Sequence, residues 1–376
     1  MIVERKPRVT GPSTLHVALT MDEATAPYNQ HCLPLARQRH IGICTYWEPG
    51  ITPPPHIPAF NGGGNFLGFI RALRRALESH PYDILHTHNP HLGALLSVMR
   101  VMFGKRWFPP LVITVRSSYS VARVKHRLMY LPTFALFDSI ICCGNASLSS
   151  FPGLYRWLGG KRLSAIQNGI NLSRVDEAPV VEKPRSFTAL TVARLVPVKN
   201  LSTAIRAAHA CKDPTAMFIL VGEGPLRSAL TKEVEELGVQ DRVQFTGLLP
   251  RDEALSRMKS SDLFVSTSLG EGLPVAVLEA MACRLPVILS DIPPHREIAQ
   301  GSSFIPLVPP NDPDGFKREI ERFQGMPQEE RHDIGRKCRK IIEERFDLWR
   351  MLSDYDREYS RVSRAWKIES TGGASG

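Results

Sequence analysis

Two glutamates, Glu271 and Glu279, lie on either side of a turn in the segment SLGEGLPVAVLEAMAC, which spans residues 268–283. Pro274 fits the first turn of a helix, where its missing N–H does no harm. The free backbone N–H groups at the start of such a helix bind anions. The expected anion site comprises Gly272, Leu273, Pro274 and Val275. Two carboxylates beside it suit a ligand with hydroxyl groups on either side of a diphosphate, but the spacing also fits an ordinary amphipathic helix with Glu279 exposed.

A second group of charged residues follows an apolar segment at residues 186–194. The sequence there reads ARLVPVKN, so Arg194 and Lys199 are five residues apart. Arginine offers a fork of donors and lysine a mobile point charge, and both stabilise a diphosphate that gains charge as it leaves. The same two residues also fit a solvated loop between a strand and a helix.

The first half of the chain has its own polar residues at strand ends. His88 and Asn89 end the segment DILHTHNP, and Arg116 follows the apolar run PLVITV. His86 lies within its strand and is expected to be a buried histidine with satisfied hydrogen bonds. We expect no metal site, because two histidines two apart on a strand are a weak signal and the Asp-x-Asp triplet at Asp312 fits a helix N-cap.

The elements that must position these residues alternate between strand and helix. Apolar strands are expected at 15–19, 41–46, 83–88, 110–115 and 139–144, and again at 186–194, 217–222, 243–247, 262–267 and 285–291. Periodic helical segments separate them, which is typical of α/β proteins with parallel sheets covered on both faces. Ligands bind such sheets at the carboxyl ends of the strands. The polar segment 176–186 separates two doubly wound domains.

We therefore expect a first domain at 1–178, a second at 186–345, a terminal helix at 346–366 and a disordered tail at 367–376. The chain has 376 residues, which exceeds the usual size of a single core. No run of eighteen apolar residues occurs, and nothing resembles a secretion signal, so a cytoplasmic protein is expected.

The two glutamates and the basic pair together resemble the signature of the family-4 retaining glycosyltransferases, which have the GT-B fold. This resemblance covers residues 186–300 and includes the turn LVGEGPL at 220–226 and the step Asn168-Gly169-Ile170. It implies two Rossmann-like domains facing a cleft, a nucleotide-sugar donor and no metal cofactor. It also implies that Arg194 and Lys199 neutralise the diphosphate, Glu271 contacts the transferred sugar and Glu279 binds the ribose, so that Glu271, Arg194 and Lys199 are the catalytic residues.

The resemblance is weaker in the first half, where the family places its acceptor. His88, Asn89 and Arg116 are expected on the acceptor side. Arg116 stands where the family often has a histidine, and it is expected to hold a phosphate or another anionic group. The terminal helix resembles one that packs back on the first domain. The family's activity would be transfer of a sugar from a UDP- or GDP-sugar to a hydroxyl of a glycan or lipid-linked acceptor, forming an α-glycosidic bond.

Two other functions fit the same fold. A nucleotide-sugar 2-epimerase would need acid and base groups that the second-half signature does not supply. A non-catalytic nucleotide-binding scaffold would not need the four residues Arg194, Lys199, Glu271 and Glu279 together.

Charge is unevenly distributed along the chain. Residues 1–180 hold 19 Lys and Arg but only 9 Asp and Glu, so the net charge of +10 lies in the first half. Part of it is interleaved with large apolar residues between positions 99 and 127, a composition typical of a surface that binds anionic lipid. A solvated basic face is the alternative, and no nucleic-acid-binding motif is present. The basic members are Arg100, Lys105, Arg106, Arg116, Arg123, Lys125 and Arg127.

Overall fold

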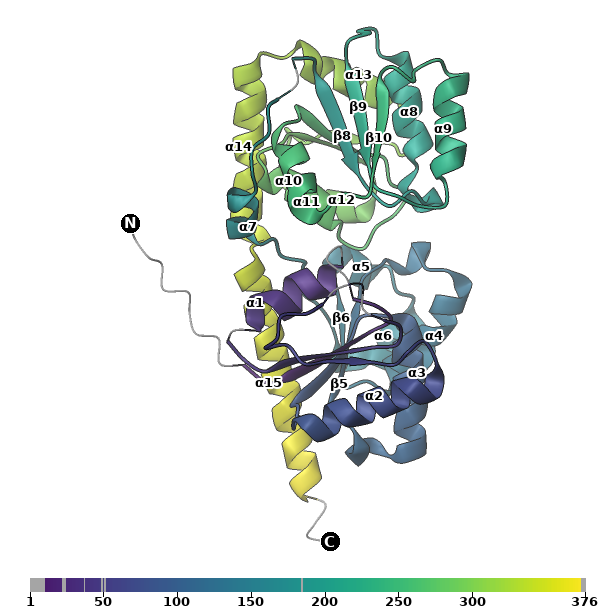
Figure 1. Cartoon of the computed structure of the whole chain (residues 1–376), viewed down its shortest axis with the longest axis vertical. Helices are drawn as coiled ribbons and strands as arrows, with labels where there is room; N and C mark the ends of the chain where they lie inside the picture. The colour runs from purple at the N-terminus through teal and green to yellow at the C-terminus, as the bar shows by residue number, and fades with distance from the viewer. Residues whose placement is uncertain are drawn as a thin grey trace, which may run out of the picture. The chain divides into compact units, whose positions relative to one another are not determined.

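The structure, a computed structural model, describes residues 11–21, 25–36, 38–48, 50, 52–183 and 185–372 (Figure 1). The chain divides into two units. Unit 1 contains the described residues up to Gln167 and those from Trp349 onward, and unit 2 is Asn168–Leu348. Residues 168–178, which the sequence assigned to the first domain, therefore belong to the second.

Unit 1 is built on a seven-stranded, fully parallel sheet with the strand order β3-β2-β1-β4-β5-β6-β7. Its strands are β1 (Thr14–Ala18), β2 (Ile41–Thr45), β3 (Ala59–Asn61), β4 (Ile84–Thr87), β5 (Leu111–Val115), β6 (Ser139–Cys142) and β7 (Leu163–Ala165). The expected apolar strands form its centre. The short edge strands β3 and β7 were not expected, because their residues are partly exposed and do not form apolar runs.

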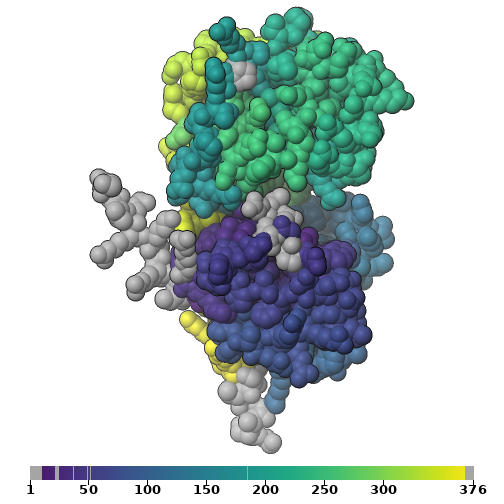
Figure 2. Space-filling view, in the orientation of Figure 1, coloured from purple at the N-terminus to yellow at the C-terminus, as the bar shows by residue number. Residues whose placement is uncertain are grey.

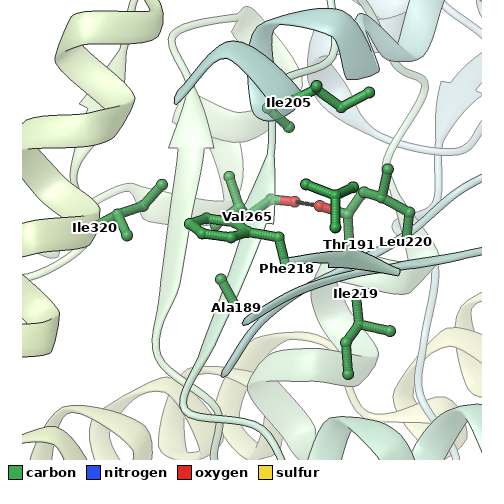
Figure 3. A pocket seen from close by; sticks show the side chains of 10 residues that line it. Ala189, Thr191, Ile205, Phe218, Ile219, Leu220, Val265 and Ile320 are labelled. Atoms are coloured by element: carbon green, nitrogen blue, oxygen red, sulfur yellow. Dashed lines mark hydrogen bonds between the residues drawn. The ribbon is translucent and has the colours of Figure 1, made fainter. Parts of the chain in front are cut away.

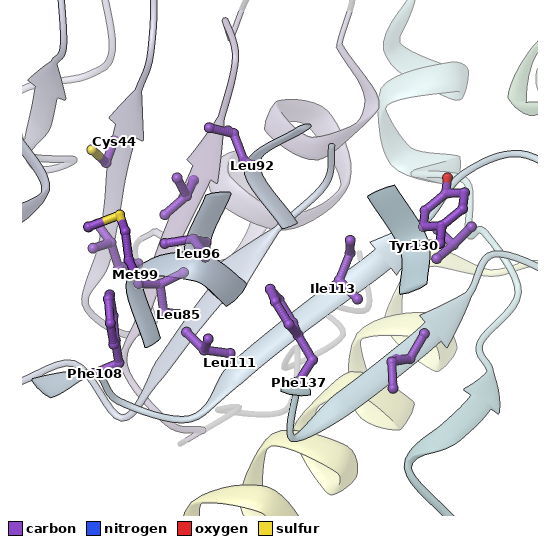
Figure 4. Packing of buried hydrophobic residues seen from close by; sticks show 14 of the residues in the cluster. Cys44, Leu85, Leu92, Leu96, Met99, Phe108, Leu111, Ile113, Tyr130 and Phe137 are labelled. Carbon is purple, nitrogen blue, oxygen red and sulfur yellow. The ribbon is translucent and has the colours of Figure 1, made fainter. Parts of the chain in front are cut away.

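Helices cover the sheet of unit 1, and α3 packs its apolar face on the central strands. Figure 4 shows Leu92, Leu96 and Met99 of α3 among the side chains of β4 and β5. Each fully buried side chain of this size contributes about 1.5–3 kcal/mol. The helices are η1 (Tyr28–Cys32), α1 (Leu33–Leu35), α2 (Phe66–Ser79), α3 (Pro90–Phe103), η2 (Lys105–Trp107), η3 (Tyr119–Val121), α4 (Val124–Leu136), α5 (Asn145–Ser149), α6 (Gly153–Gly159), η4 (Gly160–Arg162) and α15 (Leu348–Gly372).

The terminal helix α15 packs on unit 1, and part of it is visible at the surface in yellow (Figure 2). Tyr355 and Tyr359 are buried, and the Tyr355 hydroxyl lies 2.8 Å from Oγ1 of Thr114. The helix continues to Gly372, six residues beyond its expected end. Residues 367–372 are therefore helical rather than part of a disordered tail, and residues 373–376 lie outside the described residues.

Unit 2 contains a six-stranded parallel sheet with the order β10-β9-β8-β11-β12-β13. Its strands are β8 (Thr188–Val192), β9 (Met217–Val221), β10 (Val243–Gly247), β11 (Leu263–Ser266), β12 (Val287–Ser290) and β13 (Leu307–Val308). Its helices are α7 (Leu172–Glu177), η5 (Pro197–Lys199), α8 (Leu201–Ala210), α9 (Arg227–Glu236), α10 (Arg251–Lys259), α11 (Val275–Ala282), α12 (Pro293–Ala299), α13 (Pro313–Gly325) and α14 (Gln328–Arg345). Asp312 is the N-cap of α13 and accepts a hydrogen bond from the Gly315 N–H at 2.9 Å, which confirms its expected role.

Both sheets have the doubly wound order of a Rossmann fold, which confirms the expected fold class. In each sheet the winding direction reverses between the first strand and its neighbour, β1 and β4 in unit 1 and β8 and β11 in unit 2. Ligands of such sheets bind outside the carboxyl ends of the strands at this switch point. The two switch points are therefore where functional side chains should gather.

The basic segment at 99–127 is not one continuous surface. Arg100 is buried and forms a two-pronged ion pair with Asp138, at 2.7 and 3.0 Å, while Met99 and Phe108 belong to the core. Two guanidinium nitrogens of Arg116 are also buried. Exposed apolar side chains instead lie on three helices that pack side by side, α3, α4 and α6 (Figure 1). No helix in the described part of the chain is long and apolar enough to cross a membrane.

Candidate active site

A lysine and a glutamate meet at the switch point of unit 2. Lys199 ends η5, which follows β8, and Glu271 lies in the loop after β11. The Lys199 ammonium lies 2.5 Å from Oε1 of Glu271, and the Ser268 hydroxyl donates to the same oxygen at 2.7 Å. Two residues that the sequence selected separately, 72 positions apart, are thus in direct contact.

Hydrogen bonds between the two loops fix this pair. The Leu269 N–H donates to the Val198 carbonyl at 2.8 Å, and the Thr267 hydroxyl donates to the Asn200 carbonyl at 2.9 Å. Asn200 has the left-handed backbone conformation, with φ of 51°. Asparagine tolerates this conformation better than other residues with side chains, so it fits a position that otherwise favours glycine.

Glu279 is buried in α11, which excludes the alternative of an exposed residue on an amphipathic helix. Its carboxylate forms an ion pair with Arg251, the first residue of α10. Burial, with a smaller effect of the neighbouring Arg174 charge, lowers the pKa of Arg251 to about 10. The ion pair offsets the cost of burying the two charges and fixes the orientation of the carboxylate.

The expected anion-binding turn leads directly into α11. Pro274 is the residue before the helix rather than within its first turn, and Val275 is the first helical residue. The Leu273 carbonyl accepts a hydrogen bond from the side-chain amide of Asn168 at 2.8 Å. The step Asn168-Gly169 therefore has a structural role in holding this turn, and a Cβ on Gly169 would approach the Asp347 carbonyl oxygen to 2.7 Å.

Two glycines after β9 allow the loop that carries Arg194 to lie close against them. A Cβ on Gly222 would lie 2.0 Å from the Ala193 carbonyl oxygen, and one on Gly224 would lie 2.5 Å from the Leu195 carbonyl oxygen. Gly222 also has φ of +135°, which side chains rarely permit. The glycines of the LVGEGPL turn are thus required by backbone packing.

Arg194 is exposed at the end of β8, while Lys199, Ser268, Glu271 and Pro274 line a hollow beside the carboxyl ends of β8 and β11. The expected donor-site residues therefore gather around one end of one sheet. Three cations and two carboxylates are present when Arg251 is included. This arrangement can hold a dianionic diphosphate while the carboxylates accept hydrogen bonds from hydroxyl groups.

Three residues of this region were missed from the sequence: Arg251, Ser268 and His295. His295 is buried, and its Nδ1 lies 2.8 Å from the Ser290 carbonyl oxygen. The Ser290 hydroxyl in turn donates to the Ser268 carbonyl at 2.6 Å. His295, Ser290 and Ser268 thus support the loop that carries Glu271. Burial lowers the pKa of His295 to about 4, which makes the ring neutral. Arg251 could have been found, because it follows a strand at its carboxyl end as the other site residues do.

A second pocket of unit 2 does not have the chemistry of a ligand site. It lies between the sheet and the helices α8 and α13, and its lining is almost entirely hydrocarbon (Figure 3). Its polar side chain, Thr191, donates its hydroxyl hydrogen to the Val265 carbonyl at 2.7 Å. We interpret this pocket as a packing gap in the core.

The three residues expected on the acceptor side lie at the switch point of unit 1. The side chain of Asn89 accepts a hydrogen bond from the Leu19 N–H at 3.0 Å and so fixes the loop after β1. His88 is buried beside His16, and Arg116 follows β5. Nitrogen atoms of His16, His86 and His88 lie within 4.8 Å of one another, a spacing that a metal ion could bridge. However, both nitrogens of His86 already lie within hydrogen-bonding distance of hydroxyl groups, as expected for a satisfied core histidine.

The two doubly wound units and the cation–carboxylate pairs of unit 2 define a class of protein, the GT-B glycosyltransferases that act on nucleotide sugars. Sequence comparison agrees, since residues 174–341 match the model of the family described as glycosyl transferases group 1, and residues 32–174 match that of glycosyltransferase family 4. The chain belongs to this glycosyltransferase family and is an enzyme.

One relative supports this assignment by its sequence, and two solved structures support it by their fold. UDP-Gal:α-D-GlcNAc-diphosphoundecaprenol α-1,3-galactosyltransferase of Escherichia coli is 30% identical over 274 residues, which cover 67% of this chain and 68% of that enzyme. Sucrose-phosphate synthase from Thermosynechococcus elongatus has a TM-score of 0.76 at 18% identity, covering 94% of this chain and 100% of its own. Anabaena Alr3699/HepE in complex with UDP has a TM-score of 0.73 at 18% identity, covering 93% and 100%. The last two show the shared fold.

The close approach at Gly222 gives a test of the site's framework. We expect Gly222→Ala to destabilise the protein by roughly 3 kcal/mol or more, because it combines an unfavourable backbone conformation with a steric conflict against Ala193. Gly238→Ala is the matched control, since Gly238 also has positive φ but a Cβ there meets nothing within 4 Å. That control should cost only about 1 kcal/mol. Urea unfolding that gives equal losses for both variants would contradict this account of the loop.

Proposed function

We propose that this glycosyltransferase moves a sugar from a UDP- or GDP-sugar to an acceptor hydroxyl with retention, forming an α-glycosidic bond. The observation that carries the proposal is the contact between Lys199 and Glu271 at the switch point of unit 2. Arg194 is exposed on the same loop after β8 that carries Lys199. A cation for the diphosphate and a carboxylate for the sugar are thus held next to each other. The ion pair Arg251–Glu279 supplies a second oriented carboxylate for the ribose.

In the proposed reaction, the bond between the anomeric carbon and the diphosphate oxygen breaks, and the electron pair leaves with the diphosphate. The acceptor oxygen bonds to the anomeric carbon on the same face, and its proton passes to the departing phosphate oxygen. Arg194 and Lys199 stabilise the charge that develops on that oxygen, so their effect is larger in the transition state than in the ground state. No carboxylate pair flanking the anomeric carbon is needed, unlike in a glycoside hydrolase.

The two glutamates have different proposed roles. Lys199 contacts both Glu271 and the diphosphate. Glu271 accepts hydrogen bonds from hydroxyls of the transferred sugar. Glu279 accepts hydrogen bonds from the ribose, and Arg251 is its positioning residue. Burial of the Arg251–Glu279 pair favours this division, because a preoriented carboxylate loses little entropy when a hydroxyl binds.

We propose a lipid-linked or polysaccharide acceptor for unit 1. The relative from Escherichia coli, named for a diphosphoundecaprenol-linked acceptor, supports this class of acceptor. A lipid-linked acceptor requires the enzyme to reach a membrane, and unit 1 offers a suitable surface, which we call the apolar-basic face. Its apolar members are Val98, Val101, Met102, Phe103, Trp107, Val124, Leu128, Leu154 and Trp157, and its basic members are Lys105, Arg106, Arg123, Lys125 and Arg156.

The composition of the apolar-basic face favours peripheral binding to anionic lipid on the cytoplasmic side of a membrane. Trp157 is 77% exposed and Met102 is 69% exposed, although burying such side chains is favourable. Interfacial insertion of apolar side chains, with basic residues near the lipid headgroups, would remove them from water. Each basic residue near the surface would contribute on the order of 1 kcal/mol.

Turnover tests the role of the cations. We expect Arg194→Ala and Lys199→Ala each to lower kcat by roughly 10²–10³, because each removes a charge contact made to the leaving group. Lys232→Ala removes an exposed lysine of α9 in the same unit and should leave kcat unchanged. Steady-state kinetics with an accepted donor measures this. Near wild-type turnover in both single variants would refute the assignment.

Calorimetry separates the two glutamates. We expect Glu279→Gln to weaken binding of the bare nucleoside diphosphate by roughly ten- to a hundredfold, as loss of a hydrogen bond to a charged group typically does. Glu271→Gln should keep that affinity and instead lose the additional affinity that the sugar provides. Equal losses of diphosphate affinity in both variants would contradict the proposed roles.

A screen of UDP against GDP with the wild-type enzyme identifies the nucleotide by its stabilisation of the folded state.

Sedimentation with vesicles tests the apolar-basic face. Binding should require anionic lipid and weaken with salt, because the basic residues attract the headgroups through screened charges. We expect Arg106→Glu/Lys125→Glu to weaken it, whereas Arg71→Glu/Arg75→Glu makes the same charge change on α2 and should have a smaller effect. Lys105 is left unchanged because its ammonium lies 4.8 Å from the centre of the Trp366 ring. Equal binding by both double variants would exclude this face as the contact.

A further inference from the structure

Four buried histidines gather at the switch point of unit 1. His16 of β1 pairs in register with His86 of β4, His88 directly follows β4, and His31 lies in η1. The centres of the His16 and His88 rings are 5.4 Å apart, and those of His31 and His88 are 5.3 Å apart. The register of two parallel strands thus brings together side chains that lie far apart in the sequence.

The hydrogen bonds of this cluster are incomplete. His86 is satisfied, with its Nε2 lying 2.8 Å from the Thr114 hydroxyl and its Nδ1 lying 2.6 Å from the Tyr359 hydroxyl. His88 Nε2 lies 3.1 Å from His16 Nδ1, but the buried Nδ1 of His88 has no partner among the described residues. A buried polar atom without a partner is costly, and it is usually satisfied by water or by a ligand.

Arg116 is the second incomplete group. Its Nη1 donates to the side-chain oxygen of Gln30 at 3.2 Å, while Nε and Nη2 are buried with no partner among the described residues. These two nitrogens lie on the same edge of the guanidinium, which is an edge that binds two oxygens of a phosphate or a carboxylate at once.

No described carboxylate neutralises Arg116. The titratable groups that act on it are the hydroxyls of Tyr355 and Tyr359 and the thiols of Cys32 and Cys143, which are uncharged at neutral pH. Burial holds the pKa of Arg116 below its usual value, which reflects the cost of a buried cation without a counter-ion. Asp356 is close to the cluster but already forms an ion pair with Arg39 at 2.5 Å.

The charge of this region favours an anion over a metal ion. Burial, together with the smaller effects of the Arg39 and Arg116 charges, lowers the pKa of His16 to about 3, so the ring is neutral. A divalent cation here would add positive charge beside a buried guanidinium and would meet no described carboxylate ligand. An oxyanion would instead supply the missing counter-charge and accept the unpaired N–H groups.

We infer that the switch point of unit 1 binds an oxyanion of the acceptor, a phosphate or a carboxylate, between the Nε–Nη2 edge of Arg116 and Nδ1 of His88. The identification of the ligand as part of the acceptor rests on the proposed function, whereas the binding site itself follows from the geometry of unit 1. A phosphate would belong to a phosphate-linked acceptor, and a carboxylate to an acidic sugar. Both groups present two oxygens to the fork of Arg116.

Titration of the full-length protein with inorganic phosphate and, separately, with glucuronate tests the site. The readout is the Nε–H signal of Arg116 in the ¹H–¹⁵N spectrum of protein labelled at arginine, assigned by its absence in Arg116→Gln. We expect this signal to shift on binding of at least one probe. We also expect Arg116→Gln to weaken binding, measured by calorimetry, by roughly ten- to a hundredfold. The probe that binds identifies the source of the oxyanion.

Arg71→Gln is the matched control, since Arg71 is an exposed arginine of the same unit, and it should bind the probes as the wild type does. If Arg116→Gln does not fold, Arg116→Lys keeps the charge but loses the fork and should still weaken binding. UDP affinity, measured on the same samples, should not change in either variant. Failure of the wild type to bind UDP would count against the donor proposal and not against this site.

Two results would overturn the inference. In the first, neither probe shifts the Arg116 signal, which would leave water as the occupant. In the second, the probes bind only after Asp22→Asn/Glu23→Gln. This would mean that a carboxylate of the chain itself, from residues outside the described ones, pairs with Arg116.

Discussion

The ion pair between Lys199 and Glu271 joins the two loops that form the proposed donor site. One loop follows β8 and the other follows β11, and parallel strands bring their carboxyl ends to the same edge of the sheet. Neither loop is regular enough to position a charged side chain by itself. The ion pair and the backbone hydrogen bond from Leu269 to Val198 connect the two loops directly. Charge neutralisation between Lys199 and Glu271 therefore contributes to holding the two loops together, in addition to its proposed role in donor binding.

The fold was predictable from the sequence where its strands are fully buried. Five apolar runs in each half became strands of the two sheets, all of them central except β10, and their parallel arrangement followed from the helices between them. The strands that were missed, β3, β7 and β13, are short and lie at sheet edges, where partly exposed residues leave no apolar run. The domain boundary was placed about ten residues late, because the polar linker at 176–186 includes the end of α7, which packs in unit 2.

The site was predictable in part, because residues that follow strands can be read from the sequence but their partners cannot. Arg194, Lys199 and Glu271 were selected in this way, and the structure places Lys199 and Glu271 in contact. The pairing of Glu279 with Arg251 joins residues 28 positions apart on two helices, and helical periodicity does not reveal it. In unit 1 the same limit applies to His16, which meets His86 only through strand register. Arg100 was taken for a surface residue because its partner, Asp138, lies in a different segment.

Helix α15 follows unit 2 in the chain but packs in unit 1, most of which precedes unit 2. Its Tyr355 and Tyr359 lie within hydrogen-bonding distance of Thr114 and His86 at the centre of the unit 1 sheet. During synthesis, all of unit 2 leaves the ribosome before Tyr355 and Tyr359 do. The core of unit 1 therefore lacks these two tyrosines until helix α15 has been synthesised, although most of the unit precedes unit 2 in the chain.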